Sequence, residues 1–133
     1  MLVLAVALGL LPASPSRADD SSDARSTIQR QLDAFRAGDA GSAYGLAAPN
    51  IRGMFPTPDI FMRMVETGYP PVFRSRAATF GGLKPEGGGL RQEVYLSDAD
   101  GKSWIASYTL ARQADGSLKI TGCSLREGFD IGA

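Results

Sequence analysis

Few residues of this chain could carry out chemistry, because the sequence contains no histidine and only one cysteine, Cys123. Histidine is the most frequent general base and a common zinc ligand, so its absence removes the commonest forms of acid–base and zinc chemistry. The strongest remaining candidates are two polar side chains, Gln92 and Tyr108, within segments rich in apolar residues. Tyrosine titrates near a pKa of about 10, so Tyr108 is a hydrogen-bond donor and a poor base. We therefore expect no catalytic residue, no metal site and no cofactor.

Two similar turns predict how these side chains are positioned. The segments "DADGK" and "QADGS" are typical of three-residue hairpin loops with glycine in the left-handed position. With this loop length Asp98 pairs with Lys102 and Gln113 pairs with Ser117, and even-numbered residues of the joined strands share one face. These strands are predicted at residues 90–97, 103–112 and 118–125. The even-numbered face is the more apolar one and is predicted to face the core, covered by helices.

Gln92 and Tyr108 lie in one row across this predicted core face, in line with Gly122. Buried polar groups need partners, so the two side chains either satisfy each other and the backbone or line a pocket. A pocket would suit a small apolar ligand, with Tyr44 and Tyr69 as further lining residues. The face carries no carboxylate of the kind that an isomerase needs as a base.

The odd-numbered, outer face also carries apolar side chains. Tyr95, Ile105 and Leu125 are predicted to form one row, and Cys123 lies in the next row. An exposed patch of this kind suits a homodimer or a partner protein. The alternative is that the N-terminal segment or the C-terminal tail covers it.

The sequence does not match the motifs of a phosphate-binding loop or a calcium-binding loop. The segment "GGLKPEGGG" lacks the Gly-Lys-Ser/Thr ending of a phosphate-binding loop. "DADGK" resembles the start of a calcium loop, but Thr109 stands where the twelfth-position glutamate would be. Acidic and basic residues balance at 14 each, so we expect no nucleic acid partner.

The pattern of the first half of the chain predicts helices. Ser26 and Gln29 form a plausible capping box for a helix that buries Ile28, Leu32 and Phe35 and ends at Gly38. Asp39 is predicted to cap a second helix, which stops before Pro49, and a short irregular helix is predicted at residues 50–55. Thr57 and Pro58 begin a further helix that ends at Gly68.

The segment "GYPPV", residues 68–72, is predicted to convert the chain from helix to strand. Each proline fixes its own φ and disfavours a helical conformation in the residue before it. We expect the first strand at residues 73–80, followed by a flexible glycine-rich loop at residues 81–89.

The N-terminus has the pattern of an export signal. Leu2–Leu11 is an apolar run too short to span a bilayer, and Ser16-Arg17-Ala18 places small residues where a signal peptidase reads. We predict a signal peptide at residues 1–18, a single α+β domain at residues 19–133, and a periplasmic or secreted location. No membrane span is expected after cleavage.

The middle of the chain resembles a bacterial secreted family catalogued as domain of unknown function 4864. The matching motifs are Gln31–Phe35, Ala48–Ile51, Phe55–Val65 and Gly68–Val72. The order of elements is similar to the nuclear-transport-factor-two-like cone fold. It implies an α+β domain with N-terminal helices packed on one face of a curved, mainly antiparallel four-stranded sheet. The family is uncharacterised, so the resemblance implies no activity.

The sequence favours an exported domain that acts by binding. The first interpretation is a non-enzymatic module for protein interaction or dimerisation. The alternative is a pocket protein for a small apolar ligand, or a weak isomerase- or cyclase-like enzyme of the cone fold.

Overall fold

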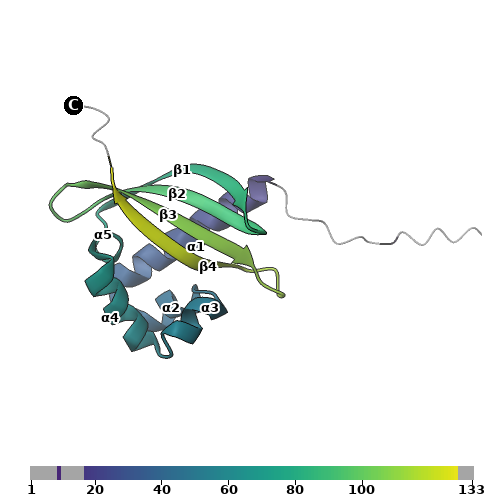
Figure 1. Cartoon of the computed structure of the whole chain (residues 1–133), viewed down its shortest axis with the longest axis horizontal. Helices are drawn as coiled ribbons and strands as arrows, with labels where there is room; N and C mark the ends of the chain where they lie inside the picture. Colours follow the sequence, from purple (N-terminus) through teal and green to yellow (C-terminus); the bar gives the residue numbers. More distant parts are fainter. Residues whose placement is uncertain (1–8, 10–16, 129–133) are drawn as a thin grey trace, which may run out of the picture.

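The computed structural model describes residue 9 and residues 17–128 of the chain. The predicted signal peptide lies almost wholly outside these residues. Within them the helices come first and gather on one side of a curved sheet (Figure 1). The sheet has four antiparallel strands in the order β1-β2-β3-β4. The predicted α+β fold class is confirmed.

The helices are α1 (Arg17–Ala37), α2 (Ala40–Gly45), α3 (Pro49–Met54), α4 (Pro58–Gly68) and α5 (Pro70–Phe73). The strands are β1 (Ala77–Glu86), β2 (Gly89–Ser97), β3 (Ser103–Arg112) and β4 (Leu118–Glu127). The core lies between α1 and the inner face of the sheet, where Ile28, Leu32, Val94, Tyr108 and Leu110 are almost fully buried. Burying one such large apolar side chain contributes roughly 1.5–3 kcal/mol.

Helix α1 begins at Arg17, so the predicted start at Ser26 is wrong. The preceding turns are helical because they pack on the domain: Ala24 is fully buried. Arg112 of β3 also holds this end of the helix through Asp20 and Asp23, with an N–O distance of 2.8 Å to each carboxylate. Burial of Ala24 and the ion pairs of Arg112 therefore extend the helix beyond the predicted cap at Ser26.

The predicted ends of the early helices agree better with the structure. Gly38 adopts a φ of 67° after α1, and Asp39 caps α2 by accepting a hydrogen bond from the Ser42 N–H at 3.1 Å. The chain then leaves the helix early, because Ala47 forms a parallel bridge with Ile120. That bridge ties the helical layer to β4.

Thr57 caps α4 as predicted, since its hydroxyl oxygen accepts a hydrogen bond from the Ile60 N–H at 3.2 Å. The predicted conversion of "GYPPV" to a strand is wrong. Pro70 begins the one-turn helix α5 after Tyr69, and the strand starts only at Ala77. A proline φ suits the first turn of a helix, where the missing N–H costs nothing.

Both predicted hairpin turns are confirmed, together with the pairings next to them. The Asp98 N–H donates to the Lys102 carbonyl at 3.0 Å, and the Gln113 N–H donates to the Ser117 carbonyl at 2.8 Å. Gly101 and Gly116 supply φ angles of 81° and 85°, which non-glycine residues rarely adopt.

The predicted flexible loop at residues 81–89 is mostly strand. Strand β1 continues to Glu86, which pairs with Gly89 across a turn made by Gly87 and Gly88. A bulge at Gly81 and Gly82 shifts the register on the way. Bulges and glycine turns let the chain keep its ladder through a segment that looks irregular in sequence.

A second bulge changes which residues of β4 face the core. Leu110 pairs with Ile120, but Thr109 pairs with Gly122, so Thr121 is the extra residue. Beyond this point Tyr108 pairs with Cys123, and Ala106 pairs with Leu125. The predicted outer-face placement of Cys123 and Leu125 is therefore wrong: both pack against the core cluster.

Candidate functional site

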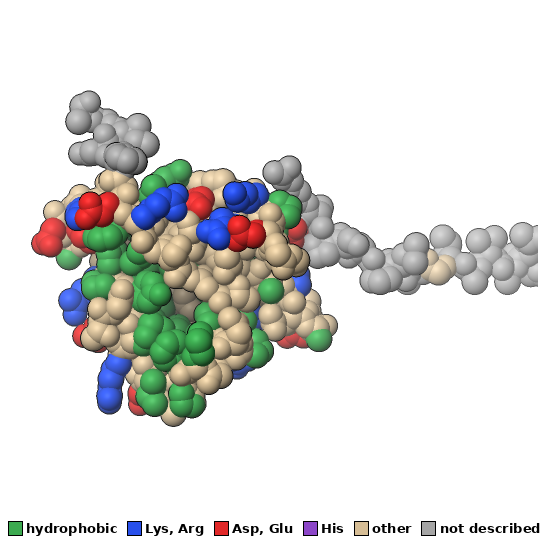
Figure 2. All heavy atoms as spheres, in the orientation of Figure 1, with side chains coloured by type: hydrophobic (Ala, Val, Ile, Leu, Met, Phe, Trp, Pro, Cys, Tyr) green, Lys and Arg blue, Asp and Glu red, His purple; other side chains and the backbone are tan. Residues whose placement is uncertain are grey.

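A cavity of about 230 Å³ lies between the helical layer and strands β3 and β4. We call it the apolar pocket. In the space-filling view, hydrophobic side chains surround a hollow between β4 and the helices (Figure 2). Its lining is Gln31, Phe35, Ile51, Met54, Phe55, Phe61, Met64, Val65, Tyr69, Val72, Tyr108, Ile120, Thr121, Gly122 and Cys123. Most of these residues are apolar, as expected for a small-molecule site.

The helical wall of the apolar pocket is built by α4 and the turn that follows it. Phe61 and Val65 are buried one turn apart on α4, and Tyr69 ends that helix. Phe61 contacts the rings of Phe35 and Tyr44, with centroid distances of 6.1 and 5.7 Å. These aromatic contacts hold the wall against α1 and α2.

The opposite wall carries Tyr108 and Cys123. The side chain of Tyr108 is 1% exposed, and its hydroxyl makes no hydrogen bond with an oxygen or nitrogen atom of the described residues; the Cys123 thiol is its polar neighbour. Burial raises the pKa of Tyr108 well above its usual value, and the neighbouring Cys123 adds to the rise. Burial also raises the pKa of Cys123 to about 12, although Tyr108 partly offsets this. Both groups are therefore neutral and protonated at neutral pH.

Gln92 was predicted to share a row with Tyr108, and the two residues do pair across β2 and β3. However, Gln92 is absent from the described lining of the apolar pocket. Its fully buried amide nitrogen donates to the backbone carbonyls of Gly81 at 3.0 Å and Glu93 at 2.8 Å. Gln92 therefore completes the β1 bulge, which is a structural role.

Of the other predicted ligand residues, Tyr69 lines the apolar pocket and Tyr44 lies outside the described lining. The hydroxyl of Tyr44 donates to the backbone carbonyl of Phe55 at 2.7 Å. Tyr44 thus fixes the segment that follows α3. Helical residues such as Phe61 and Met64 were not predicted as site residues; their position after the Thr57 cap was the signal available in the sequence.

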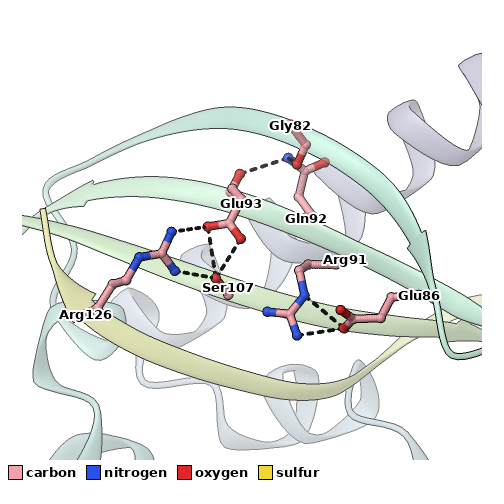
Figure 3. Close-up of polar contacts among 7 residues, drawn as sticks. All are labelled: Gly82, Glu86, Arg91, Gln92, Glu93, Ser107 and Arg126. Carbon is pink, nitrogen blue, oxygen red and sulfur yellow. Dashed lines mark hydrogen bonds and ion pairs between the residues drawn. The ribbon is translucent and has the colours of Figure 1, made fainter.

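The outer face of the sheet carries a polar cluster, which Figure 3 shows between β2, β3 and β4. The Ser107 hydroxyl donates to Glu93 at 2.7 Å, and Arg126 lies 3.1 Å from the same carboxylate. Next to it lie Tyr95, which is 45% exposed, and its cross-strand neighbour Ile105. Among the predicted interface residues, only these last two lie on the outer face.

A larger groove of about 750 Å³ runs between α1, α2 and the β3–β4 turn. Several of its charged groups have partners: Arg112 pairs with Asp20 and Asp23, and the Lys119 ammonium donates to the Gly45 carbonyl at 2.6 Å. The buried Nε atom of Arg112 has no partner among the described residues. The groove is lined mainly by charged and polar side chains. The apolar pocket is the better candidate site for a small apolar molecule because most of its lining is apolar.

Residues 9 and 17–128 contain no cluster of His, Cys, Asp or Glu side chains that could hold a metal ion. Nor does any helix there have the length and apolar character needed to cross a membrane.

The family of this chain follows from comparison with known proteins. The family described as "Domain of unknown function (DUF4864)" matches residues 17–130. The chain belongs to this family. The match spans all the elements that build the apolar pocket, from α1 to β4. No curated protein matches the chain.

Solved structures show that this DUF4864 domain has an NTF-2-like fold. An NTF-2-like protein of unknown function from Silicibacter pomeroyi is 13% identical with a TM-score of 0.57, covering 85% of this chain and 99% of that one. A protein from Catenulispora acidiphila, in complex with S-DNPA, is 18% identical with a TM-score of 0.56, covering 84% and 95%. At these identities the likeness concerns the fold alone.

Proposed function

We propose that this domain binds a small apolar molecule in the apolar pocket. The observation that carries the proposal is a cavity of about 230 Å³ lined by Phe35, Phe61 and Val65 on one side and Tyr108 on the other. An engineered apolar cavity of about 150 Å³ binds benzene, so this pocket has room for one ring with a short substituent. The S-DNPA complex of the Catenulispora acidiphila protein is further support, since that protein shares the fold.

The proposed activity is binding without catalysis. The sequence has no histidine, and the described lining of the apolar pocket contains no carboxylate. A proton-transfer enzyme would need such a group close to its substrate. The protonated thiol of Cys123 is likewise a poor nucleophile, because the thiolate is the reactive form.

A ligand screen with a blocking variant tests this proposal. Met64→Trp would place a larger side chain in the pocket, whereas Met62→Trp makes the same change on the same helix outside the described lining. We expect one-ring compounds such as toluene, indole or cyclohexanone to raise the Tm of wild type and Met62→Trp, with little effect on Met64→Trp. A ligand at 100 times its Kd stabilises a protein by about 2.7 kcal/mol. If no compound raises the wild-type Tm, the proposal is wrong.

A second candidate function is self-association through the outer face of the sheet. It is supported by Tyr95, which is 45% exposed and pairs with Ile105 on the outer face, next to the polar cluster of Glu93, Ser107 and Arg126. Light scattering after size exclusion should then show a wild-type dimer and a monomeric Ile105→Asp variant. Ile60→Asp is the matched control, because Ile60 is exposed on α4. A monomeric wild type would rule this candidate out.

We also propose that the chain is exported, with removal of residues 1–18. The support is the apolar run Leu2–Leu11 and the small residues at positions 16 and 18. Cleavage after Ala18 would keep both ion pairs between Arg112 and the start of α1. Mass spectrometry of protein from a periplasmic extract should find a chain that begins at Asp19. Recovery of the uncleaved chain from the cytoplasm alone would contradict export.

A further inference from the structure

The two polar groups of the inner pocket wall are neighbours only because of the β4 bulge. In the register predicted from the turn alone, Tyr108 would pair with Gly122. The extra residue Thr121 moves Cys123 into that place instead. The bulge thus puts a phenol and a thiol side by side on the wall of the apolar pocket.

The Tyr108 hydroxyl is buried and makes no hydrogen bond with an oxygen or nitrogen atom of the described residues; the Cys123 thiol is its polar neighbour. The amide nitrogen of its cross-strand neighbour Gln92 donates to the β1 bulge, and the Gln92 Oε1 atom also lacks a partner among the described residues. Buried hydroxyls in native proteins are almost always hydrogen-bonded, and sulfur is a weak acceptor, so a hydroxyl with only a thiol beside it can donate to an acceptor that comes from outside the chain.

The surroundings of Tyr108 determine what that acceptor can be. The described lining holds no Lys, Arg, Asp or Glu, so an anionic group would enter without a charged partner. Burying an unpaired charge is far costlier than burying a neutral group that accepts a hydrogen bond. The raised pKa values of Tyr108 and Cys123 keep both as neutral donors at neutral pH.

We propose that Tyr108 and Cys123 form a subsite for a neutral hydrogen-bond acceptor, such as a ketone or ether oxygen, carried by a one-ring apolar ligand. This inference rests on the proposed function, since it names the ligand class of the same pocket. The ring would lie among Phe61, Val65 and Ile51, and the oxygen would accept a hydrogen bond from the Tyr108 hydroxyl.

Three probes of matched size test the subsite. Acetophenone carries a carbonyl oxygen, α-methylstyrene replaces that oxygen with a CH₂ group, and benzoate carries a negative charge. Titration calorimetry should show wild type binding acetophenone at least about tenfold more tightly than either of the others. Tyr108→Phe should abolish the preference over α-methylstyrene while leaving the affinity for α-methylstyrene unchanged. Tyr95→Phe, on the outer face, should keep the preference.

A spectroscopic readout separates a hydrogen bond from a change in packing. The carbonyl stretch of bound, ¹³C-labelled acetophenone should move to lower frequency in wild type relative to Tyr108→Phe. Equal affinity of wild type for acetophenone and α-methylstyrene would overturn the subsite while leaving apolar binding intact. Failure of all three probes to bind would instead contradict the proposed function and the subsite together.

Discussion

Two bulges interrupt the same sheet, and they differ in what happens to the polar groups around them. At the β1 bulge, the Gln92 amide donates to the carbonyls of Gly81 and Glu93 and lies outside the apolar pocket. At the β4 bulge, the Tyr108 hydroxyl makes no hydrogen bond with an oxygen or nitrogen atom of the described residues, and Tyr108 lines that pocket. Gln92 and Tyr108 pair directly across β2 and β3. Two neighbouring polar groups in one row of the sheet thus differ in role: Gln92 is structural, and Tyr108 is a candidate functional residue.

The comparison teaches that burial of a polar side chain does not by itself mark a site. Both residues are almost completely buried, and both were candidates from the sequence. The difference lies in the donors: the Gln92 amide nitrogen donates to backbone carbonyls and so stabilises the fold, whereas the Tyr108 hydroxyl has no oxygen or nitrogen acceptor among the described residues. The following predictions test this difference, in decreasing order of expected effect.

Gln92→Leu should cause the largest loss of stability. The change keeps the volume roughly constant but leaves the carbonyls at the β1 bulge without their buried donor. We expect the free energy of unfolding to fall by about 2–4 kcal/mol, measured by urea denaturation. Gln113→Leu is the control, since Gln113 is only partly buried at a hairpin, and it should cost less than about 1 kcal/mol. Equal effects of the two variants would remove the structural role assigned to Gln92.

Gly122→Ala should damage the β4 bulge. A Cβ atom at this position would lie 2.9 Å from Thr109 Oγ1, which accepts a hydrogen bond from Thr121 Oγ1 at 2.9 Å. We expect a loss of about 1–3 kcal/mol in the same denaturation assay. Gly53→Ala in α3 meets no atom within 4 Å and should stabilise the chain by about 0.5–1 kcal/mol. A harmless Gly122→Ala would show that the bulge tolerates a side chain.

The thiol of Cys123 should make the fold sensitive to alkaline pH. Its pKa is about 12 in the folded chain against 9.0 normally, so the folded state holds its proton more tightly. The stabilisation is fully present below about pH 9 and is lost as the pH rises towards about 12. Cys123→Ala should therefore flatten the fall of unfolding free energy with pH, by at most about 1.4 kcal/mol per pH unit. Parallel curves for wild type and variant would show that this thiol is not shielded from water.

Tyr108→Phe should have the smallest effect on the stability of the ligand-free protein. Because its hydroxyl makes no hydrogen bond with an oxygen or nitrogen atom of the described residues, its removal should change the unfolding free energy by less than about 0.5 kcal/mol. The contrast with Gln92→Leu is the direct test of the comparison. Loss of a buried hydrogen bond costs about 1–3 kcal/mol. A fall in the free energy of unfolding of about 2 kcal/mol or more would therefore mean that the Tyr108 hydroxyl has a hydrogen-bond partner within the protein.

Much of the fold could be predicted from local signals in the sequence. The Ala-Asp-Gly segments predicted both hairpin turns and the pairings next to them, because a loop of fixed length with glycine at a positive φ allows one pairing. Thr57 predicted the start of α4, since its hydroxyl has an unpaired N–H to cap. The site was only partly accessible in this way: Tyr108 and Tyr69 line the apolar pocket, whereas Gln92 and Tyr44 do not.

The errors came from features that depend on distant parts of the chain. The start of α1 depends on Arg112, which lies on β3, 92 positions after its partner Asp20 in the sequence. The face of Cys123 depends on one extra residue, Thr121, which is hydrogen-bonded to Thr109 of β3 and to Asn50 of α3. Gly122 was the one signal of this bulge in the sequence of β4, since glycine inside a strand often marks a bulge.

The sequence by itself determined that helices precede strands, as well as the two Ala-Asp-Gly turns and the inward face of β2 and β3, because these follow from side-chain period and local backbone preference. Only the tertiary structure decided which polar groups find partners. Hydrogen bonding between Gln92 and the β1 bulge, and the lack of an oxygen or nitrogen acceptor for Tyr108 among the described residues, depend on how strands slip against one another. A slip of one residue exchanges the two faces of a strand, and here it brought Cys123 from the predicted outer face into the wall of the pocket.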